Sequence, residues 1–389
     1  MQTQFIAGRA LVRVWCARRR RVLALVCALA AVGVFPAASV SAAPASGTHQ
    51  AIPLSVAHQE QCGPAGSNPS TPAMASMFVG TTNYTFLAWS DCTTGNTVII
   101  GATNPAVDSN WGNCGSVCTR RTLQTRSLSE NGTYAGPALA ALNGTLYIAN
   151  TGTDFHLWVG RYDFTTTVKN DLQLPELSDY TPALAAHLAS GTFKLYLAWT
   201  GRDQFHHLNV ESSSDGLTWS GKVTGTDTAA AGPGLTDWQT QLYIAWMATN
   251  SAHWVCLGYF TGTPFSPTLA NHTCPRNCDL GPNNCTQITT EGDVGLTSST
   301  SRLYLGYRGT DDGSGAGCPP GSGLPTKEVN IGASSDGFAF DYLDLDCKGQ
   351  VLPPAGTGVL YQYPVVWGTY VQVGSGGVKV NLSTNAAFH

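Results

Sequence analysis

This sequence contains few charged residues and, beyond residue 42, no long apolar run. Asp, Glu, Lys and Arg make up only 11% of the 389 residues, and no Lys or Arg occurs between Arg21 and Arg120. Such a chain is poorly suited to bind the phosphate backbone of a nucleic acid. A membrane-spanning helix needs about 20 consecutive apolar residues, and no later segment provides them. We therefore expect no nucleic-acid partner and no membrane insertion.

The first 42 residues predict an export signal. A basic cluster, Arg18 to Arg21, precedes an apolar run from Val22 to Phe35, and small residues then lead to Ala42. This order is typical of a secretory signal peptide. We expect cleavage near Ala42, a linker over 43–50, and a secreted, monomeric domain over 51–389. Cleavage removes six Arg and leaves 14 basic against 24 acidic residues, a net charge near −10.

The cysteines predict disulfides. Of the 12 Cys, Cys16 and Cys27 lie in the predicted signal, which leaves an even number, ten, in the exported chain. An even count in an oxidising compartment is typical of paired cysteines. Cys274, Cys278 and Cys285 lie close enough in sequence to suggest a zinc site, but disulfides are the stronger interpretation. We predict no metal and no cofactor.

Turn-forming residues are abundant, and the sequence repeats itself. The chain has 43 Gly and 21 Pro, which favours an all-β protein. Six related segments, such as "TPALAA" followed by "LYLAW", begin 65, 45, 51, 61 and 63 residues apart. This period, with several strands per unit, is typical of β-propeller blades. The repeats begin at Thr71, Gly136, Thr181, Gly232, Asp293 and Gly356.

Each repeat predicts four strands. The first is rich in small residues, as the crowded axis of a propeller requires, and the second has apolar residues on both faces because neighbouring blades cover both. The sixth repeat ends after its third strand, at "VKVNLS". We expect Ala51–Ala57 to supply the missing strand beside Val378–Leu382, which would leave no open sheet edge. The predicted fold is therefore an all-β, six-bladed β-propeller closed by an N-terminal strand.

Two repeats contain a related turn, "SSSDGLTW" in the third and "SSDGFAF" in the fifth. The Asp is expected to accept backbone N–H groups, the Gly to adopt a positive φ, and the aromatic ring to pack against the blade. The motif resembles the Asp-box, or bacterial neuraminidase repeat, of sialidase-like propellers. The structural residues are Ser213, Asp215, Gly216 and Trp219 in the first copy, and Ser334, Asp336, Gly337 and Phe340 in the second.

This resemblance implies where a ligand would bind. In such propellers the turns between strands 3 and 4 lie opposite the active site, and the loops before strand 1 and after strand 2 form the ligand face. A sialidase of this superfamily needs three Arg, a Tyr–Glu pair and an Asp, with the first Arg near the first blade. The absence of Lys and Arg between Arg21 and Arg120 leaves that position empty. We therefore do not expect ordinary sialidase activity.

The predicted ligand face contains carboxylates and aromatic residues. Asp179, Glu291 and Asp293 precede first strands and are the candidate catalytic residues, because other glycosidases use pairs of carboxylates. The alternative for the Asp residues that follow second strands is a turn-forming role, and for the aromatic residues it is packing between blades. The candidate ligand-binding residues that follow or end second strands are Asp91, Arg202, Asp203, Arg308, Asp311, Asp312, Trp89, Trp199, Trp246 and Tyr307.

Three histidines occupy similar places in successive repeats. His156 and His207 are equivalent, and His253 lies within one position of them. A shared metal site is one interpretation, but inheritance of a repeated residue is the stronger one, because third strands splay apart away from the axis. The histidines therefore do not change the prediction that the chain binds no metal.

Three functions remain open from the sequence. The leading hypothesis is an exported propeller that binds an extracellular glycan or another cell-surface ligand on the predicted ligand face. The alternatives are a glycoside hydrolase that uses carboxylates of the same face, and a structural or protein-interaction propeller.

Overall fold

In a computed structural model, the described part of the chain consists of strands and turns. The chain divides into two compact units, 1–43 and 44–389, and every described residue belongs to the second. No helix within the described residues is long and apolar enough to cross a membrane. The structure describes residues 48–51, 71–91, 97–103, 135–162, 169–189, 191–260, 269–277, 286–309, 329–337, 339–346, 358–362, 365–374 and 377–385.

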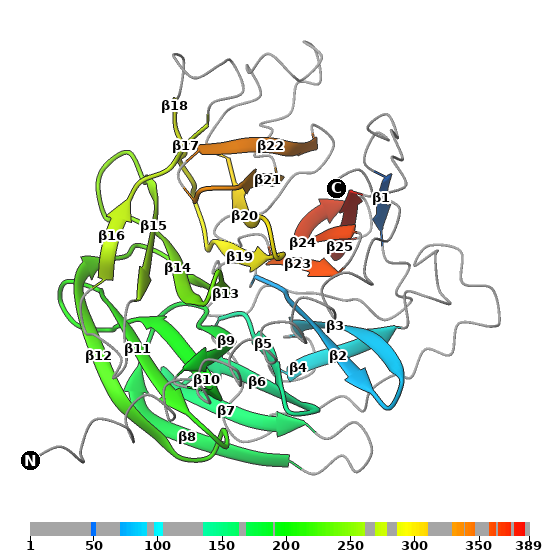
Figure 1. Ribbon diagram of the computed structural model, residues 1–389, viewed down its shortest axis with the longest axis vertical. Coiled ribbons are helices and arrows are strands. Elements are labelled where there is room, and N and C mark those ends of the chain that lie inside the picture. The colour runs from blue at the N-terminus through cyan, green and yellow to red at the C-terminus, as the bar shows by residue number, and fades with distance from the viewer. Residues whose placement is uncertain are drawn as a thin grey trace, which may run out of the picture. The chain divides into compact units, whose positions relative to one another are not determined.

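The described strands form six sheets (Figure 1). Within each sheet, consecutive strands pair antiparallel, as the repeats predict. The first strands are β2 (Ala73–Val79), β5 (Ala138–Leu142), β9 (Ala183–Ala189), β13 (Gly234–Trp238), β19 (Gly295–Ser298) and β23 (Gly358–Gln362). The second strands are β3 (Thr82–Asp91), β6 (Thr145–Thr151), β10 (Thr192–Thr200), β14 (Gln241–Met247), β20 (Leu303–Arg308) and β24 (Val365–Gly374).

Outer strands complete the sheets. The third strands are β4 (Thr97–Thr103), β7 (His156–Tyr162), β11 (His207–Ser213), β15 (Val255–Phe260), β21 (Val329–Ser334) and β25 (Gly377–Asn385). The fourth strands are β8 (Lys169–Leu177), β12 (Trp219–Thr228), β16 (Leu269–Thr273) and β22 (Ala339–Asp346). Two short strands, β17 (Arg276–Asn277) and β18 (Thr286–Gln287), extend the fifth sheet, and β17 pairs parallel with β22.

The sixth sheet takes its fourth strand from the other end of the chain. The strand β1 (Thr48–Ala51) pairs antiparallel with β25, with Thr48 opposite Thr384 and Ala51 opposite Asn381 (Figure 1). The pairing strand therefore begins three residues before the predicted Ala51–Ala57 segment, inside the predicted linker. Residues 52–57 lie outside the described part.

Contacts between sheets follow the order of the chain. The first strands β2, β5, β9, β13, β19 and β23 each contact the next, and β23 contacts β2. In β10, Leu195, Leu197 and Trp199 pack against the second sheet, whereas Tyr196 and Ala198 pack against the fourth. Apolar residues on both faces of a second strand thus serve two neighbouring sheets, as the sequence predicts.

The two Ser-Asp-Gly turns have the predicted hydrogen bonds. Asp215 Oδ1 accepts the backbone N–H groups of Leu217 and Thr218 at 2.8 and 2.7 Å, and Ser213 Oγ accepts that of Gly216 at 2.8 Å. In the second copy, Asp336 Oδ1 accepts the N–H of Ala339 at 3.0 Å and Ser334 Oγ that of Gly337 at 2.8 Å. Both turns join a third to a fourth strand. They are therefore folding devices away from the predicted ligand face.

One predicted disulfide lies in the described part. Cys256, in β15, is bonded to Cys274, just beyond β16. It joins the two outer strands of the fourth sheet, and it makes Cys274 unavailable as a zinc thiolate. Eight further cysteines of the predicted exported chain, Cys278 and Cys285 among them, lie outside the described residues.

Candidate functional site

One end of each sheet forms a common face. Because first and second strands are antiparallel, the start of one lies beside the end of the other, as in the pairing of Ala183 with Ala198. Hydrogen bonds described below connect these ends from one sheet to the next. We call this the loop face, and it is where the sequence predicts a ligand.

The six repeat-initial residues alternate between those with and without a side chain. Thr71, Thr181 and Asp293 have side chains, whereas Gly136 and Gly232 between them have none, and Gly356 lies outside the described residues. A Cβ on Gly136 would overlap the Thr71 carbonyl, and one on Gly232 would overlap that of Thr181. Alternation is therefore needed, because the space where the first strands begin holds a side chain from only every second sheet.

Asp293 is the centre of this arrangement. Its carboxylate accepts hydrogen bonds from Thr71 Oγ1 at 2.6 Å, from the Gly232 N–H at 2.5 Å, and from the Thr181 side chain. Thr181 Oγ1 in turn accepts the Gly136 N–H at 3.0 Å. Burial raises the pKa of Asp293, and the hydrogen bonds from Thr181, Thr71 and Gly232 oppose that rise. This network joins residues from five repeats.

A narrow cavity lies between the first strands. Its volume is about 80 Å³, and its lining includes Thr71, Thr181 and Asp293 together with residues of all six first strands. Pockets for drug-sized ligands have roughly 300–1,000 Å³. The cavity is therefore too small for an oligosaccharide, and Asp293, only 9% exposed, faces the interior rather than a binding cleft.

Hydroxyl groups at the ends of second strands connect one sheet to the next. Thr151 Oγ1 donates to the carbonyl of Tyr180, and Thr200 Oγ1 to that of Ala231, both at 2.7 Å. Ser90, at the equivalent place in the first sheet, donates to Ala135 at 3.5 Å. Each acceptor directly precedes the repeat-initial residue of the following sheet. This contact is structural and needs only a small hydroxyl side chain.

Arg308 occupies this same position in the fifth sheet. The pairing of Gly295 with Gly306 in β19 and β20 matches that of Ala183 with Ala198, so Arg308 is equivalent to Thr200. Its side chain is 0% exposed, and Nη1 lies 3.2 Å from Glu291 Oε2. Burial lowers the pKa of Arg308, and the Glu291 carboxylate opposes this. No described residue accepts a hydrogen bond from Nε or Nη2. A buried guanidinium with unused donors is costly to a folded protein.

A second ion pair lies at a matching place in the third sheet. Asp179 and Glu291 each lie two residues before a repeat-initial residue, and each is 29% exposed. Asp179 Oδ1 is 3.0 Å from Arg202 Nε, and the guanidinium carbon of Arg202 lies 3.5 Å from the centre of the Phe155 ring. The three predicted catalytic carboxylates thus have separate partners: Asp179 pairs with Arg202, Glu291 with Arg308, and Asp293 with Thr71, Thr181 and Gly232.

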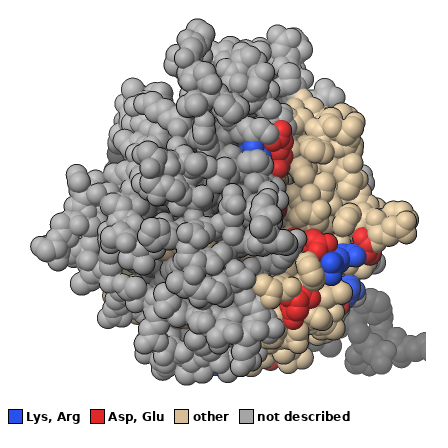
Figure 2. Space-filling view, turned by 180° about the vertical axis from the view of Figure 1, so that it is seen from behind, with Lys and Arg blue, Asp and Glu red and all other residues tan. Residues whose placement is uncertain are grey.

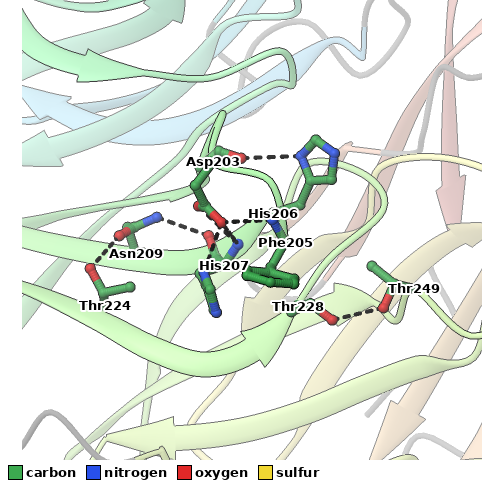
Figure 3. A network of polar contacts seen from close by, with 9 residues as sticks. Asp203, Phe205, His206, His207, Asn209, Thr224, Thr228 and Thr249 are labelled. Carbon is green, nitrogen blue, oxygen red and sulfur yellow. Dashed lines mark hydrogen bonds and ion pairs between the residues drawn. The ribbon is translucent and has the colours of Figure 1, made fainter.

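Asp203 has the turn-forming role that the alternative interpretation predicted. It accepts the backbone N–H groups of Phe205 and His207 at 3.0 and 3.2 Å and contacts His207 Nδ1 at 2.8 Å (Figure 3). Asp154 accepts the His156 N–H at 3.1 Å in the second sheet in the same way. Each His therefore binds the Asp of its own loop. Asp91 ends β3, its side chain is outside the described part, and Asp311 and Asp312 lie there entirely.

The aromatic residues of the second strands are interior packing residues. Trp199 is 1% exposed and Trp246 and Tyr307 are 2% exposed, each in a different hydrophobic cluster between sheets. Trp89 is buried as well. These rings have no face available for a sugar, so packing between blades, the alternative interpretation, accounts for them.

Sequence reasoning missed three residues of the loop face. Thr71 and Thr181 hydrogen-bond to Asp293, and their place as first residues of repeats is a signal that pointed to them. Phe205, by contrast, is 61% exposed, which no sequence pattern indicated.

On the face shown in Figure 2, described acidic and basic side chains lie next to one another, in keeping with pairs such as Lys222 with Glu176.

Comparisons with solved structures show the fold. An α-L-arabinofuranosidase from Fusarium graminearum, bound to an iminosugar inhibitor, matches 88% of this chain and 97% of its own, with 12% identity and a TM-score of 0.53. An α-L-arabinanase from Penicillium chrysogenum, bound to arabinobiose, matches 88% and 98%, also with 12% identity and a TM-score of 0.53. A Trypanosoma rangeli sialidase with sialic acid matches 82% of this chain and 55% of its own, with 12% identity and a TM-score of 0.51.

These similarities show that the chain has a β-propeller fold. At 12% identity they show the fold alone. Comparison with family models found no match, and comparison with curated proteins found none either.

Proposed function

We propose that this chain is an exported, six-bladed β-propeller, closed by β1, that binds an extracellular glycan on its loop face. The order of contacts among the first strands and the pairing of β1 with β25 support the blade count and the closure. The Cys256–Cys274 disulfide supports an oxidising compartment. The three similar structures, which are bound to an iminosugar inhibitor, arabinobiose and sialic acid, support a carbohydrate ligand.

Arg308 is the observation on which the proposal depends most. Three other sheets have a Ser or Thr at its position, and in each the hydroxyl makes the structural contact between sheets. An Arg there is unnecessary for that contact and leaves Nε and Nη2 without a described acceptor. Guanidinium donors bind hydroxyl and carboxylate oxygens in a fixed geometry. Arg308 is itself 0% exposed, so its proposed role is to hold the Glu291 carboxylate, which is 29% exposed, at the loop face where a ligand reaches it.

The test is glycan binding by the mature protein. An array that includes arabino-oligosaccharides and sialylated glycans should show binding to at least one class. Arg308→Met should weaken that binding by about 10- to 100-fold, the range for a charge-assisted hydrogen bond, and Arg308→Lys should restore only part of it. Arg161→Met, on β7, is the matched control and should bind normally. Absence of binding by folded protein would overturn the proposal, whereas equal binding by Arg308→Met would overturn the role of Arg308.

Glycoside hydrolysis is the second candidate, because Asp179 and Glu291 are partly exposed carboxylates at equivalent positions of the third and fifth sheets. If the chain hydrolyses arabinan or an aryl arabinofuranoside, Asp179→Asn or Glu291→Gln should lower kcat by about 10²- to 10⁴-fold. We expect no release of sialic acid from a fluorogenic sialoside. Binding without turnover of any of these substrates would favour the first candidate.

A further inference from the structure

The loop after β10 is held in one conformation by its own hydrogen bonds. Besides the contacts of Asp203 described above, the Gly201 N–H donates to the His207 carbonyl at 2.8 Å, and the His206 N–H donates to the Asp203 carbonyl at 3.1 Å. Asn209 Nδ2 also donates to the His207 carbonyl at 2.8 Å. Figure 3 shows this network. The loop presents its side chains on a preorganised backbone, which lowers the entropic cost of binding.

The same pattern of loop hydrogen bonds occurs in the second sheet, between β6 and β7, although that loop is shorter by two residues. There the Gly152 N–H donates to the His156 carbonyl at 2.8 Å, and Asp154 accepts the backbone N–H of His156 as Asp203 accepts that of His207. His156 lies four positions after Gly152, whereas His207 lies six positions after Gly201. These hydrogen bonds therefore form without the two additional residues of the loop after β10, and Phe205 is one of those additional residues.

Phe205 is exposed to solvent, so its ring contributes little to the stability of the fold. Its side chain is 61% exposed, although apolar burial is the main gain in folding. Its described ring contact is edge-on, with His207 at 5.6 Å between ring centres. An exposed aromatic ring on a rigid loop is a platform for the apolar face of a sugar ring.

Polar groups suited to sugar hydroxyls lie beside this ring. His207 pairs with Thr228 in the strand register, and Thr228 Oγ1 lies 2.7 Å from Thr249 Oγ1 of the next sheet. The His207 ring binds Asp203 through Nδ1, and no described residue bonds Nε2. Burial raises the pKa of Asp203, but hydrogen bonds from Phe205 and His207 lower it further, below its usual value. Asp203 is thus a carboxylate at neutral pH, and as a carboxylate it accepts the hydrogen bond from His207 Nδ1.

Charge decides which sugars fit this surface. The Asp203 carboxylate, 41% exposed, repels anionic sugars, and the nearby Arg202 does not offset it because Arg202 is paired with Asp179. The ligand of this surface is therefore uncharged.

From these observations we propose that Phe205, His207, Thr228 and Thr249 form a subsite for a neutral sugar residue, which stacks on the Phe205 ring. We call these four residues the Phe205 subsite. It lies on the third and fourth sheets, separate from Arg308 on the fifth, and it rests on the proposed function, because it extends a glycan-binding face. An extended glycan would place a neutral residue here.

The test compares two exposed phenylalanines. Arabino-oligosaccharides, xylo-oligosaccharides and cello-oligosaccharides are titrated against wild type, Phe205→Ala, Phe205→Trp and Phe193→Ala. Phe193 is 49% exposed and is the second residue of β10, at the opposite end of the strand from Phe205. Phe205→Ala should weaken binding by about tenfold, Phe205→Trp should retain it, and Phe193→Ala should match wild type. In saturation-transfer NMR, ring protons of the bound sugar should lose signal in Phe205→Ala.

The outcomes separate the two proposals. If wild type binds and Phe205→Ala binds equally well, the subsite is refuted while glycan binding stands. If binding depends on Phe205 but not on Arg308, the subsite stands and the role of Arg308 falls. If wild type binds none of these neutral probes, the subsite is overturned, and a positive result on sialylated glycans alone would leave the loop-face proposal standing.

Discussion

At the scale of single residues, side chains at equivalent positions of the repeats have different roles. A hydroxyl at the end of a second strand suffices to connect two sheets, as Thr151 and Thr200 show. Arg308, at the same position, makes an ion pair with Glu291 and has unused donors instead. In a repeated fold, a residue that differs from its equivalents in other repeats and lowers stability indicates a role other than packing.

Gly216 gives a prediction at this scale. It has a φ of +75°, and a Cβ there would overlap the Tyr147 ring of the neighbouring sheet. Gly216→Ala should lower the free energy of unfolding by about 1–2 kcal/mol for the backbone conformation and by about 1–3 kcal/mol more for the overlap. Urea denaturation followed by fluorescence measures the loss.

Gly221 is the matched control for this prediction. Its φ is +70°, but a Cβ there would meet nothing within 4 Å. Gly221→Ala should therefore show only the conformational part of the loss. Equal destabilisation by the two substitutions would show that the Tyr147 contact contributes nothing.

At the scale of elements, the decisive feature is a strand borrowed from the other end of the chain. An open edge on β25 would expose unpaired N–H and C=O groups, which favour aggregation. Pairing with β1 covers part of that edge. The outer strands of the fourth sheet are held differently, by the Cys256–Cys274 bond. Sheets of one fold thus secure their outer strands by different means.

Truncation tests the contribution of β1. A chain that begins at residue 52 loses all four β1–β25 pairs, whereas one that begins at Thr48 keeps them. At roughly 0.2–1 kcal/mol per cross-strand pair, the shorter chain should be less stable by about 1–4 kcal/mol. It should also form larger species in size-exclusion chromatography. Identical melting and elution of the two chains would show that β1 does not secure the sixth sheet.

At the scale of the whole molecule, a single carboxylate connects distant repeats. Asp293 joins Thr71, 222 residues earlier, to Thr181 and Gly232. Such a network couples the sheets, because loss of one member leaves the other buried polar groups without partners. Asp293 is therefore best understood as a structural residue of the propeller axis.

The pH dependence of stability tests this role. Because burial raises the folded-state pKa of Asp293, its stabilising effect is complete below the unfolded value of about 3.9 and is lost as pH rises through the folded value. The stability of wild type relative to Asp293→Asn should therefore fall as pH increases from about 4. Urea midpoints measured between pH 3 and 8 would follow the change.

The stability that Asp215 contributes should change with pH in the direction opposite to that of Asp293. Backbone hydrogen bonds from Thr218 and Leu217 lower its pKa, so the stability that it contributes is present above its unfolded pKa and is lost as pH falls through the folded value. The stability of wild type relative to Asp215→Asn should therefore decrease toward acid pH. A difference curve of the same sign for both substitutions would contradict the assignment of Asp293 as a buried axial group.

The sequence alone determined the local architecture. Repeat starts, apolar residues on both faces of second strands, and the Ser-Asp-Gly turns predicted strands and turns that the described part contains. These features depend on neighbouring residues, through the period-two alternation of a strand and the conformational freedom of Gly. The same rules gave a turn as the alternative to ligand binding for Asp203. They placed the start of the closing strand three residues late, at Ala51 instead of Thr48.

Only the tertiary structure decided which side chains are buried and which partners they meet. Trp199 and Trp246 look like a sugar platform in the sequence, yet neighbouring sheets cover them. Asp293 looks like a catalytic acid, yet Thr71 and Thr181 enclose it. Phe205 has no pattern at all, yet it is exposed. Burial is set by residues far apart in the chain, so no local pattern contains it, and the function of a side chain depends on that burial.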